Sequence, residues 1–562
     1  MENSIRRAAV DAARERAWPA ICLLAGVLVT TFLWKLYQAR SFMRRLQRQG
    51  KPMPPHHWLL GHLPIAARVF RSLPPHAHLL LIADQIRRLH PELDTAFYLD
   101  VWPFGPPALM VVSPEIVSQF TQEGNLPKYK GVRKFLKPLT GKKDLVTMEG
   151  HEWKHWRNNF NPGFRASNIM DMVPTMIEEV RTYRDIIHQH AQTGDMFPLE
   201  LPTLAMSMDI IGRVVMDEKF NSQREYNPLC EGLIDQLAWC DAGMHSNPLG
   251  YVNVARPFVQ RYNAWRMNSY VDPLLKQRYE TVHQRKGSKF IVDLIMGAYV
   301  KENTANTTKD GKAPKIDAEF SEFMRAQVKL FLQAGHDTTA ASIVFTLHLL
   351  SKHPDTLRRL RSELDAVFGR DTTTTCDVLS ENPHLLNQCD FLLAVVKETL
   401  RIYPPTATAR FGLPGFSLTD PSNDNAPLPT EGCLVVGNHF GIHHNPRFWP
   451  RADEFVPERW LVAEGHELYP VKNGWRPFER GPRNCLGQEL AMTEIRLVVA
   501  IMCREFEFRE AYGESDRAKR LETERLRVNG ERCYQIIRGG GHPSDNYPCR
   551  VHLVGKVDGK TA

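Results

Sequence analysis

The chain has 562 residues, of which 43% are hydrophobic, and this apolar content is enough for a sizeable buried core. The formal net charge of +8 is modest, and no dense basic tract with interleaved aromatics occurs, so the sequence argues against nucleic-acid binding. A basic balance better suits an acidic protein partner or an anionic membrane face. The ten cysteines are scattered without a Cys-x-x-Cys pair, which indicates a reducing compartment.

The first predicted element is an apolar helix, Trp18–Trp34, which contains no charged residue. Its 17 positions reach about 25 Å as a helix, near the lower limit for crossing a bilayer. Basic residues without any acid among them follow it: Lys35, Arg40, Arg44, Arg45, Arg48 and Lys51. The positive-inside tendency therefore places the C-terminal side in the cytosol. We predict a retained single-pass anchor; a cleaved signal peptide and a buried core helix are the alternatives.

This pattern divides the chain into four regions. Residues 1–17 are predicted to be a short luminal N-terminus and residues 18–36 the transmembrane anchor. Residues 37–56 form a basic and proline-rich linker, which Lys51-Pro-Met-Pro-Pro makes stiff and extended. Residues 57–562 form the folded domain.

Helical periodicity dominates the folded domain. The clearest predicted helices are Ile169–His190, Ser321–Leu350, Pro354–Phe368, Asn387–Ile402 and Gln488–Phe506. The predicted strands include Asp94–Val101, Ala108–Val112 and Cys433–Val436. The predicted surface loops are Asn303–Lys315, Asp371–Thr375 and Gly539–Pro548. The fold class is therefore mainly α with minor β.

The most specific motif is the run Phe478-Glu-Arg-Gly-Pro-Arg483-Asn-Cys485-Leu-Gly487. Its glycines allow a tight turn and a close approach to a large flat partner. A helix-forming segment follows at once, and its free N–H groups stabilise negative charge on the sulfur. A thiolate that donates electron density to haem iron favours O–O cleavage. The alternative is a buried structural cysteine beside a turn.

This run resembles the haem-ligand signature of the cytochrome P-450 family, Phe-x-x-Gly-x-Arg-x-Cys-x-Gly, and every fixed position matches. Ala491 and Glu494 continue the family's usual pattern after the cysteine. The resemblance extends from about Pro52 to the C-terminus and implies one large domain with the cytochrome P-450 fold. It implies haem b as cofactor, Cys485 as the axial iron ligand, and Phe478 and Gly487 as further cofactor-binding residues.

A second motif, Ala334-Gly-His-Asp337-Thr338-Thr, lies inside the predicted helix Ser321–Leu350. It resembles the family's oxygen-activation motif. The resemblance implies that Thr338 hydrogen-bonds iron-bound dioxygen and that Asp337 relays protons to it, which is general acid delivery. The alternative is a kinked helix in which the threonine bonds back to its own backbone.

The segment Glu398-Thr-Leu-Arg401 pairs opposite charges at positions i and i+3. As a surface pair this would be worth little. It resembles the family's Glu-x-x-Arg, however, and Pro457-Glu-Arg459-Trp460 resembles the partner motif, with Trp where Phe is commoner. The resemblance implies a buried, structural charge network of Glu398, Arg401 and Arg459.

Four further residues match positions that bind the haem propionates in the family. Trp153 and Arg157 form the family's Trp-x-x-x-Arg, and a guanidinium suits a charge-assisted contact to a carboxylate. Arg410 and Arg483 match two more propionate-binding positions.

Two alternatives come from other classes of protein. The run His151-Glu152-x-x-His155 would put two imidazoles on one helix face with a general base, which is typical of a zinc metallopeptidase. No downstream zinc ligand completes a recognisable signature. A haem protein that senses ligands without turnover would have no use for Asp337 and Thr338.

The resemblance also implies a substrate pocket and a reaction. The pocket residues are Thr406, Ala407, Thr408 and Ala409, with Leu332 and His336 on the oxygen-activation helix, and the loop 129–146 lies beside them. The segment 474–480 resembles fungal members that tailor secondary metabolites. We expect one oxygen atom of O₂ to be inserted into a lipophilic polyketide or terpenoid, with fatty-acid or xenobiotic hydroxylation as the alternative.

The electron source must be another protein, because no Gly-x-Gly-x-x-Gly nucleotide fingerprint occurs. Microsomal members of the family take electrons from NADPH through NADPH–cytochrome P-450 reductase, and cytochrome b5 is a second candidate partner. The resemblance thus implies a single-pass protein of the endoplasmic reticulum membrane, in contact with lipid, with its catalytic domain facing the cytosol.

Overall fold

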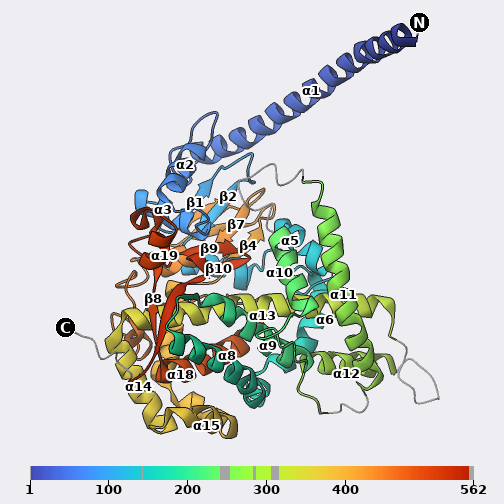
Figure 1. Ribbon diagram of the computed structural model, residues 1–562. Coiled ribbons are helices and arrows are strands. Elements are labelled where there is room, and N and C mark those ends of the chain that lie inside the picture. The colour runs from blue at the N-terminus through green and yellow to red at the C-terminus, as the bar shows by residue number, and fades with distance from the viewer. Residues whose placement is uncertain (1, 142, 241–252, 283–286, 305–315, 556–562) are drawn as a thin grey trace.

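The computed structural model describes residues 2–141, 143–240, 253–282, 287–304 and 316–555. Helices form most of the molecule, and small sheets lie toward one side (Figure 1). The helices are α1 (Glu2–Arg48), α2 (Leu63–Ser72), α3 (Leu80–Leu89), α4 (Pro114–Ser118), α5 (Lys130–Thr140), α6 (Gly150–Phe160), α7 (Ala166–Met170), α8 (Val173–Thr193), α9 (Glu200–Met216), α10 (Pro228–Cys240), α11 (Arg256–Glu280), α12 (Ile291–Thr304), α13 (Ala318–Lys352), α14 (Pro354–Phe368), α15 (Thr375–Glu381), α16 (Asp390–Ile402), α17 (His439–His443), α18 (Gln488–Glu505) and α19 (Tyr512–Ala518).

The strands are short and pair into small sheets. They are β1 (Ala96–Leu99), β2 (Ala108–Val111), β3 (Phe197–Pro198), β4 (Thr408–Phe411), β5 (Ser417–Asp420), β6 (Ala426–Pro429), β7 (Leu434–Gly437), β8 (Phe506–Glu510), β9 (Gln535–Arg538), β10 (Gly540–Pro543) and β11 (Pro548–Leu553). The largest sheet has the order β1-β2-β7-β4, in which only β2 and β7 run parallel. The others are β3-β11-β8, β9-β10 and β5-β6. The predicted fold class, mainly α with minor β, is confirmed.

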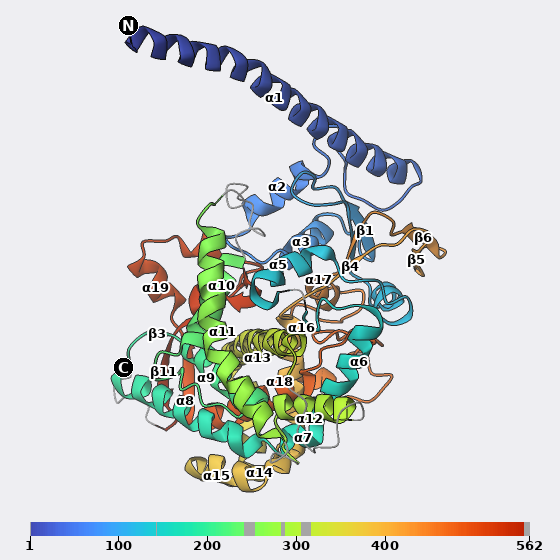
Figure 2. The ribbon, with the colours of Figure 1, turned by 90° about the vertical axis from the view of Figure 1, so that its right-hand side faces the viewer.

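Helix α13 runs through the interior of the molecule in both views (Figures 1 and 2). The side chain of Asp317 caps its N-terminus by accepting the Phe320 N–H. Almost all of its side chains from Phe320 onward are buried, as expected of a helix enclosed by others. Gly335 allows α9 to approach, because a Cβ at this position would lie 2.7 Å from the Ile211 side chain.

Comparison with the predicted elements confirms most of them and corrects the C-terminal loop. Pro354–Phe368 has the predicted bounds and the other predicted helices and strands are present with shifted ends, except that the predicted helix Ile169–His190 is divided between α7 and α8 by a turn at 171–172. The segment Gly539–Pro548, however, is not a surface loop: it contains strand β10, which is buried and packs against α13. The glycines of this segment allow close packing on neighbouring residues. A Cβ at Gly541, for example, would lie 2.4 Å from the Gln535 side chain. Most of the predicted loop Asn303–Lys315 lies outside the described residues.

Helix α1 projects away from the body of the protein in both views (Figures 1 and 2). Its apolar side chains, from Trp18 to Trp34, are exposed, and the helix is long enough to cross a membrane. The helix continues to Arg48, so much of the predicted linker 37–56 is helical. Met43 and Leu46 are buried against the largest sheet, and Arg40 pairs with Asp100 at 2.5 Å. Burial of these side chains explains why the helix persists beyond the apolar segment.

A buried carboxyl joins α18 to α9. The Ser207 hydroxyl donates a hydrogen bond of 2.5 Å to Glu494 Oε1, and burial raises the pKa of Glu494 to about 8. Because an unfolded glutamate ionises near pH 4.5, this residue should cost the protein stability progressively as the pH rises from 4.5 to 8.

We expect Glu494→Gln to raise the free energy of unfolding at pH 8 by up to about 4 kcal/mol and to change it little at pH 4.5. The amide keeps the hydrogen bond from Ser207 but cannot ionise. Denaturant titrations at both pH values measure the effect, with the exposed Glu489→Gln on the same helix as the control. A Glu494→Gln variant that is no more stable than the native protein at pH 8 would show that the carboxyl is not held neutral.

Candidate active site

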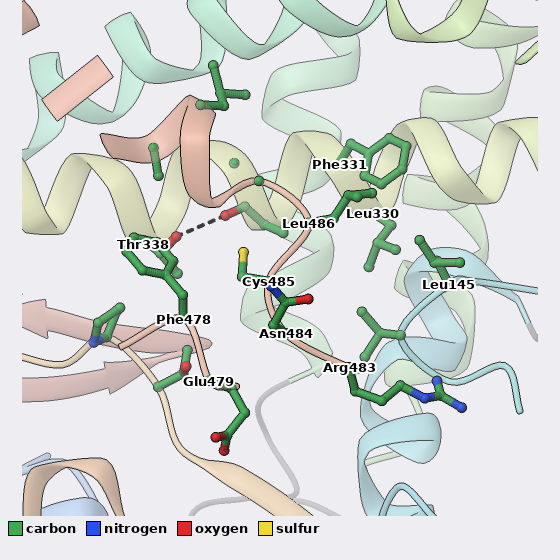
Figure 3. Close-up of a pocket in the computed structure, with 18 of the residues that line it drawn as sticks. Leu145, Leu330, Phe331, Thr338, Phe478, Glu479, Arg483, Asn484, Cys485 and Leu486 are labelled. Carbon is green, nitrogen blue, oxygen red and sulfur yellow. Dashed lines mark hydrogen bonds between the residues drawn. The ribbon is translucent and has the colours of Figure 1, made fainter. Parts of the chain in front are cut away.

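A cavity of about 320 Å³ lies between α13 and the segment that carries Cys485 (Figure 3). Most of its lining is apolar. The side chains contributed by α13 and by the cysteine segment include Leu330, Phe331, Ala334, Thr338, Phe478, Cys485, Leu486 and Leu490. Residues 405–408 close another side. The cavity can therefore enclose a flat apolar group with the Cys485 sulfur on one side and α13 on the other.

Cys485 is held in a tight turn directly before α18. Its N–H donates to Phe478 O at 2.8 Å. Gly481 has a φ of +90°, and a Cβ there would lie 2.5 Å from Thr121 O, so only glycine fits this turn. Figure 3 shows the sulfur pointing toward α13.

Cys485 lies inside the protein, but its side chain is exposed to the cavity. Burial raises the pKa of the thiol, whereas the backbone N–H of Gly487 and the Arg157 guanidinium favour the thiolate. A coordinated metal ion would remove the thiol proton outright. The sulfur is therefore placed and polarised as a ligand for a cation in the cavity.

Lys128, Arg157 and Arg483 line the cavity, and Arg410 lies close to Lys128 and Arg483 without being among the lining residues. Arg410 is fully buried, and none of its three guanidinium nitrogens has a hydrogen-bond partner in the described structure. An unpaired buried guanidinium is costly. The arrangement therefore requires an anionic ligand at this position.

Arg483 and Trp153 lie together beside this position. The Arg483 guanidinium stacks 3.9 Å from the centre of the Trp153 ring, donates to Met148 O at 2.7 Å and pairs with Glu149. Its Nε has no hydrogen-bond partner in the described structure. Burial lowers the pKa of Arg483 to about 10.

Arg157 contacts the cysteine segment. Its two terminal nitrogens donate to Asn484 O at 3.0 Å and to Asn484 Oδ1 at 2.8 Å. Both donors are thus committed to the residue before Cys485. In this arrangement Arg157 fixes the ligand turn and supplies positive charge near the sulfur.

Lys128 is a cation that the motifs did not indicate. It lines the same cavity, and burial together with Arg410 and Arg483 lowers its pKa to about 7. A single lysine after a proline carries no recognisable sequence pattern. Only the pairing of its segment with Arg410 on β4 brings it to the site.

The adjacent residues Thr338 and Asp337 face different surroundings. Thr338 lines the cavity, and its hydroxyl donates to Ala334 O at 3.0 Å (Figure 3). Asp337 is buried outside the cavity lining, with Oδ1 at 3.0 Å from His542 Nε2. Neighbouring positions on a helix point about 100° apart, which explains the separation.

The expected substrate-pocket residues divide into two groups. Thr406, Ala407 and Thr408 line the cavity. Ala409, Leu332 and His336 are not among the lining residues of this cavity, and their assignment to the substrate pocket stays a prediction. On α13, Leu332 and His336 lie between the positions that face the cavity. On β4, the side chains of successive residues point to opposite faces, so Ala409 points away from the face that carries Thr408.

Several lining residues had no motif to indicate them: Phe164, Ile211, Leu330 and Phe331. The expected loop 129–146 contains helix α5 and then contributes Leu145 and Val146 to the lining. Apolar side chains of this kind are recognised as pocket residues only after the chain segments are brought together.

Glu398, Arg401 and Arg459 lie together behind the site, and each side chain is fully buried. Arg401 donates to both Glu398 oxygens at 3.0 and 2.8 Å, and Arg459 Nε donates to Oε1 at 3.0 Å. The Val456 N–H and the Trp460 indole also donate to this carboxylate at 3.0 Å. One carboxylate thus joins α16 to the segment 456–460.

The His-Glu-x-x-His run does not form a metal site. His151, Glu152 and His155 are exposed on α6. Among the described residues, no group of three or more His, Cys, Asp or Glu side chains is arranged to hold a metal ion. The metallopeptidase alternative is not supported.

Comparison with known proteins agrees with this geometry. The family model for cytochrome P450 matches residues 52–532. The cytochrome P450 monooxygenase polC of Polytolypa hystricis (strain UAMH7299) is 72% identical over 535 residues, 95% of each chain. The cytochrome P450 monooxygenase acrF of Aspergillus aculeatus is 30% identical over 87% of this chain and 99% of its own. The crystal structure of the cytochrome P450DA haem domain superposes with a TM-score of 0.67 at 21% identity, over 90% of this chain and 97% of that one.

This chain belongs to the cytochrome P450 family. It is a monooxygenase with haem as cofactor, its electrons come from a redox partner, and its substrate is lipophilic. Its residues fit haem, since the cavity combines a cysteine sulfur, apolar walls and the guanidinium groups of Arg157 and Arg483, and Arg410, whose guanidinium has no hydrogen-bond partner among the described residues, is buried close by. The exposed apolar part of α1 fits a membrane anchor.

Proposed function

We propose that this enzyme inserts one oxygen atom from O₂ into a lipophilic secondary metabolite, a polyketide or a terpenoid. The observation that carries the proposal is the cavity in which the Cys485 sulfur faces α13 and Thr338 between apolar walls. Haem, when bound, supplies the redox iron at which dioxygen is reduced. The small side chains at residues 406–408 leave room for a bulky substrate beside it.

The proposed roles of the haem-binding residues follow from their contacts. Cys485 would ligate the iron of haem bound in this cavity, and Phe478 and Gly487, which line the same cavity, would border it. Arg410 and Arg483 bind the propionates, because their unpaired nitrogens need an anionic partner. Trp153 supports this by stacking on Arg483, and Arg157 by holding Asn484.

The proposed catalytic residues are Thr338 and Asp337. Thr338 and Thr339 on α13 both line the cavity, and Thr338 is the one that directly follows Asp337 in the chain. To donate toward the cavity, the Thr338 hydroxyl must release Ala334 O. Asp337 is the acid that supplies it with protons. Apolar neighbours such as Phe331 and Leu486 keep the cavity poor in water, so that protons arrive through these side chains.

We expect Thr338→Ala to keep haem binding but to lower product formed per NADPH by about tenfold and to increase peroxide release correspondingly. The variant removes the hydroxyl without altering the cysteine turn. The measurement is product, peroxide and NADPH consumption in the reductase-supported reaction. Thr338→Ser, which retains the hydroxyl, is the matched control; unchanged coupling in the alanine variant would remove Thr338 from proton delivery.

The substrate class is tested by deleting the gene and comparing metabolites with the parent strain. An accumulating polyketide or terpenoid, converted by the purified enzyme to a product that carries an oxygen atom from ¹⁸O₂, supports the proposal. An effect confined to fatty acids would instead favour hydroxylation of those compounds.

We further propose that the protein lies in the endoplasmic reticulum membrane, with residues 1–17 in the lumen, residues 18–36 as the anchor and residues 57–562, the catalytic domain, in the cytosol. NADPH–cytochrome P450 reductase supplies the electrons, and cytochrome b5 is a second partner. The exposed apolar α1 and the basic residues after it support this orientation. Degradation of the domain by protease added to sealed microsomes tests it, whereas protection would reverse the orientation.

A further inference from the structure

A buried histidine connects two carboxylates behind the oxygen-activation helix. His542 on β10 has 1% of its surface exposed. Its Nδ1 lies 2.7 Å from Glu200 Oε1 on α9, and its Nε2 lies 3.0 Å from Asp337 Oδ1 on α13. Both carboxylates are themselves buried. One imidazole therefore bridges two acids from different helices.

The charges of this triad require a protonated histidine. A neutral ring would carry a proton on only one nitrogen, whereas an imidazolium donates from Nδ1 to Glu200 and forms an ion pair with Asp337 through Nε2, a contact of 3.0 Å without hydrogen-bond geometry. Burial alone would lower the pKa of His542, but Asp337 and Glu200 together raise it to about 10. The histidine in turn holds the pKa of Asp337 below its usual value, against the effect of burial.

Other charged and titratable groups face His542, and none replaces either carboxylate. His336 on α13 and His78, which precedes α3, lie close enough to interact with it electrostatically. Burial lowers the pKa of His78 to about 4, and His542 contributes to that decrease. Both neighbours are therefore expected to be neutral at physiological pH, which leaves His542 as the cation between the two acids.

The triad leads from Asp337 toward the solvent. Glu200 Oε2 has no hydrogen-bond partner in the described structure and lies 3.9 Å from Arg538 Nη1. The Arg538 side chain is 48% exposed and donates to Asn546 Oδ1 at 2.6 Å. Arg538, Glu200, His542 and Asp337 thus form a continuous series of polar groups from the surface to α13.

The glycine-rich turn between β9 and β10 leaves the inner end of this series uncovered. A Cβ at Gly539 would lie 3.4 Å from Asp337 Oδ2, and a Cβ at Gly540 would lie 3.3 Å from the same atom. The Cβ at Gly540 would also lie 3.6 Å from the Thr338 methyl group. A Cβ at either position would therefore come into contact with Asp337, so the two glycines bring the backbone of this turn close to the carboxylate.

We propose that His542 positions Asp337 and supplies it with protons during turnover, with Glu200 at the outer end of the route. In this step the Nε2–H bond of the imidazolium breaks and an O–H bond forms on Asp337. The neutral imidazole is then protonated at Nδ1 alone, so the ring must turn over until the free Nε2 faces Glu200 and takes up a proton from water that enters near Arg538, after which it returns to its first orientation. This inference rests on the proposed role of Asp337 in proton delivery.

The first test uses the holoenzyme with its reductase, oxidising NADPH without added substrate. We expect His542→Gln to increase the share of O₂ released as peroxide, rather than reduced to water, by about threefold or more. The carbon-monoxide spectrum should be unchanged, because the cysteine ligand is untouched. His353→Gln is the matched control. His353 directly follows the C-terminal end of α13, and its Nδ1 lies 2.8 Å from Leu349 O. An unchanged peroxide share in His542→Gln overturns the proposal.

Asp337→Asn distinguishes a failure of this inference from a failure of the proposed function. If Asp337→Asn raises the peroxide share and His542→Gln does not, only the role of His542 is wrong. If neither variant changes it, proton delivery does not pass through Asp337, and both proposals fail.

A second measurement does not require the variant to turn over. In the reduced, carbon-monoxide-bound native protein, ¹⁵N NMR of the histidine rings should show a ring that is still doubly protonated at pH 8.5, where ordinary histidines are neutral. The signal should disappear in His542→Gln or in Glu200→Gln. Absence of such a ring from the native spectrum contradicts the proposal, even if the His542 variant does not fold.

The stability of the protein provides a third readout. A raised histidine pKa contributes stability that is complete below pH 6.5 and is lost as the pH rises toward 10. The difference in free energy of unfolding between the native protein and His542→Gln should therefore shrink across this interval. A difference that does not depend on pH would indicate a packing role alone.

Discussion

Replacement of Cys485 by serine is expected to abolish both the red-shifted Soret band of the reduced, carbon-monoxide-bound protein and all monooxygenase activity. The serine hydroxyl fits the same turn, whose hydrogen bond between the Cys485 N–H and Phe478 O does not involve the sulfur. It cannot supply the thiolate that donates electron density to the iron. The loss should therefore be chemical rather than conformational.

The control for this variant is Cys503→Ser, which replaces a second cysteine in the C-terminal part of the chain. Cys503 is buried in α18 and is not among the residues that line the cavity, so its sulfur is not placed to act as a ligand there. Its replacement should keep the red-shifted band. Reduced difference spectra of both variants, together with far-ultraviolet circular dichroism to confirm folding, measure the effect. A native protein with an unshifted band, or a Cys485→Ser variant that keeps the shifted one, would refute the ligand assignment.

Replacement of Glu398 by alanine is expected to have the largest effect on stability. Glu398 accepts hydrogen bonds from Arg401, Arg459, the Val456 N–H and the Trp460 indole. Removal of this carboxylate leaves two buried guanidinium groups without their anion. The expected cost is about 3–5 kcal/mol, a large part of the stability of a typical domain.

The chain offers a matched control in Glu522→Ala. Glu522 and Arg525 have the same i, i+3 spacing and lie 2.7 Å apart, but their side chains are 71% and 83% exposed. This pair is expected to contribute less than about 1 kcal/mol. Denaturant unfolding and the yield of haem-containing protein should separate the two variants. Equal losses would mean that burial does not determine the importance of the Glu398 network.

Much of this protein was predictable from short stretches of its sequence. The cysteine turn, the apolar helix near the N-terminus and the periodicity of helices such as α13 and α14 depend on residues within a few turns of one another. The sequence also brought Glu398 and Arg401 together, because residues three apart share a helix face. The resemblance supplied the third member, Arg459, which lies 3.0 Å from Glu398 in the fold.

Other features were not accessible from the sequence, because they depend on contacts between distant segments. Composition alone favoured a surface loop for the segment that contains His542, yet pairing with β9 and packing on α13 bury it. The same packing decides that Asp337 meets an imidazole more than 200 positions away along the chain. From composition alone, a glycine-rich segment is predicted to be flexible. Only the structure shows that neighbouring residues leave little space for a side chain at these positions.

The sequence by itself determined the fold class, the membrane-length helix and the chemistry of the cysteine motif, because each is encoded by neighbouring residues. Only the tertiary structure decided which cations are left without a partner and which way each motif residue faces. Within the part of the chain that the structure describes, the Arg410 guanidinium has no hydrogen-bond partner while Arg157 donates to Asn484, and Thr338 faces the cavity while Asp337 faces His542. The physical reason is that a buried charge must be neutralised by whatever the fold places beside it, and sequence proximity does not specify that partner.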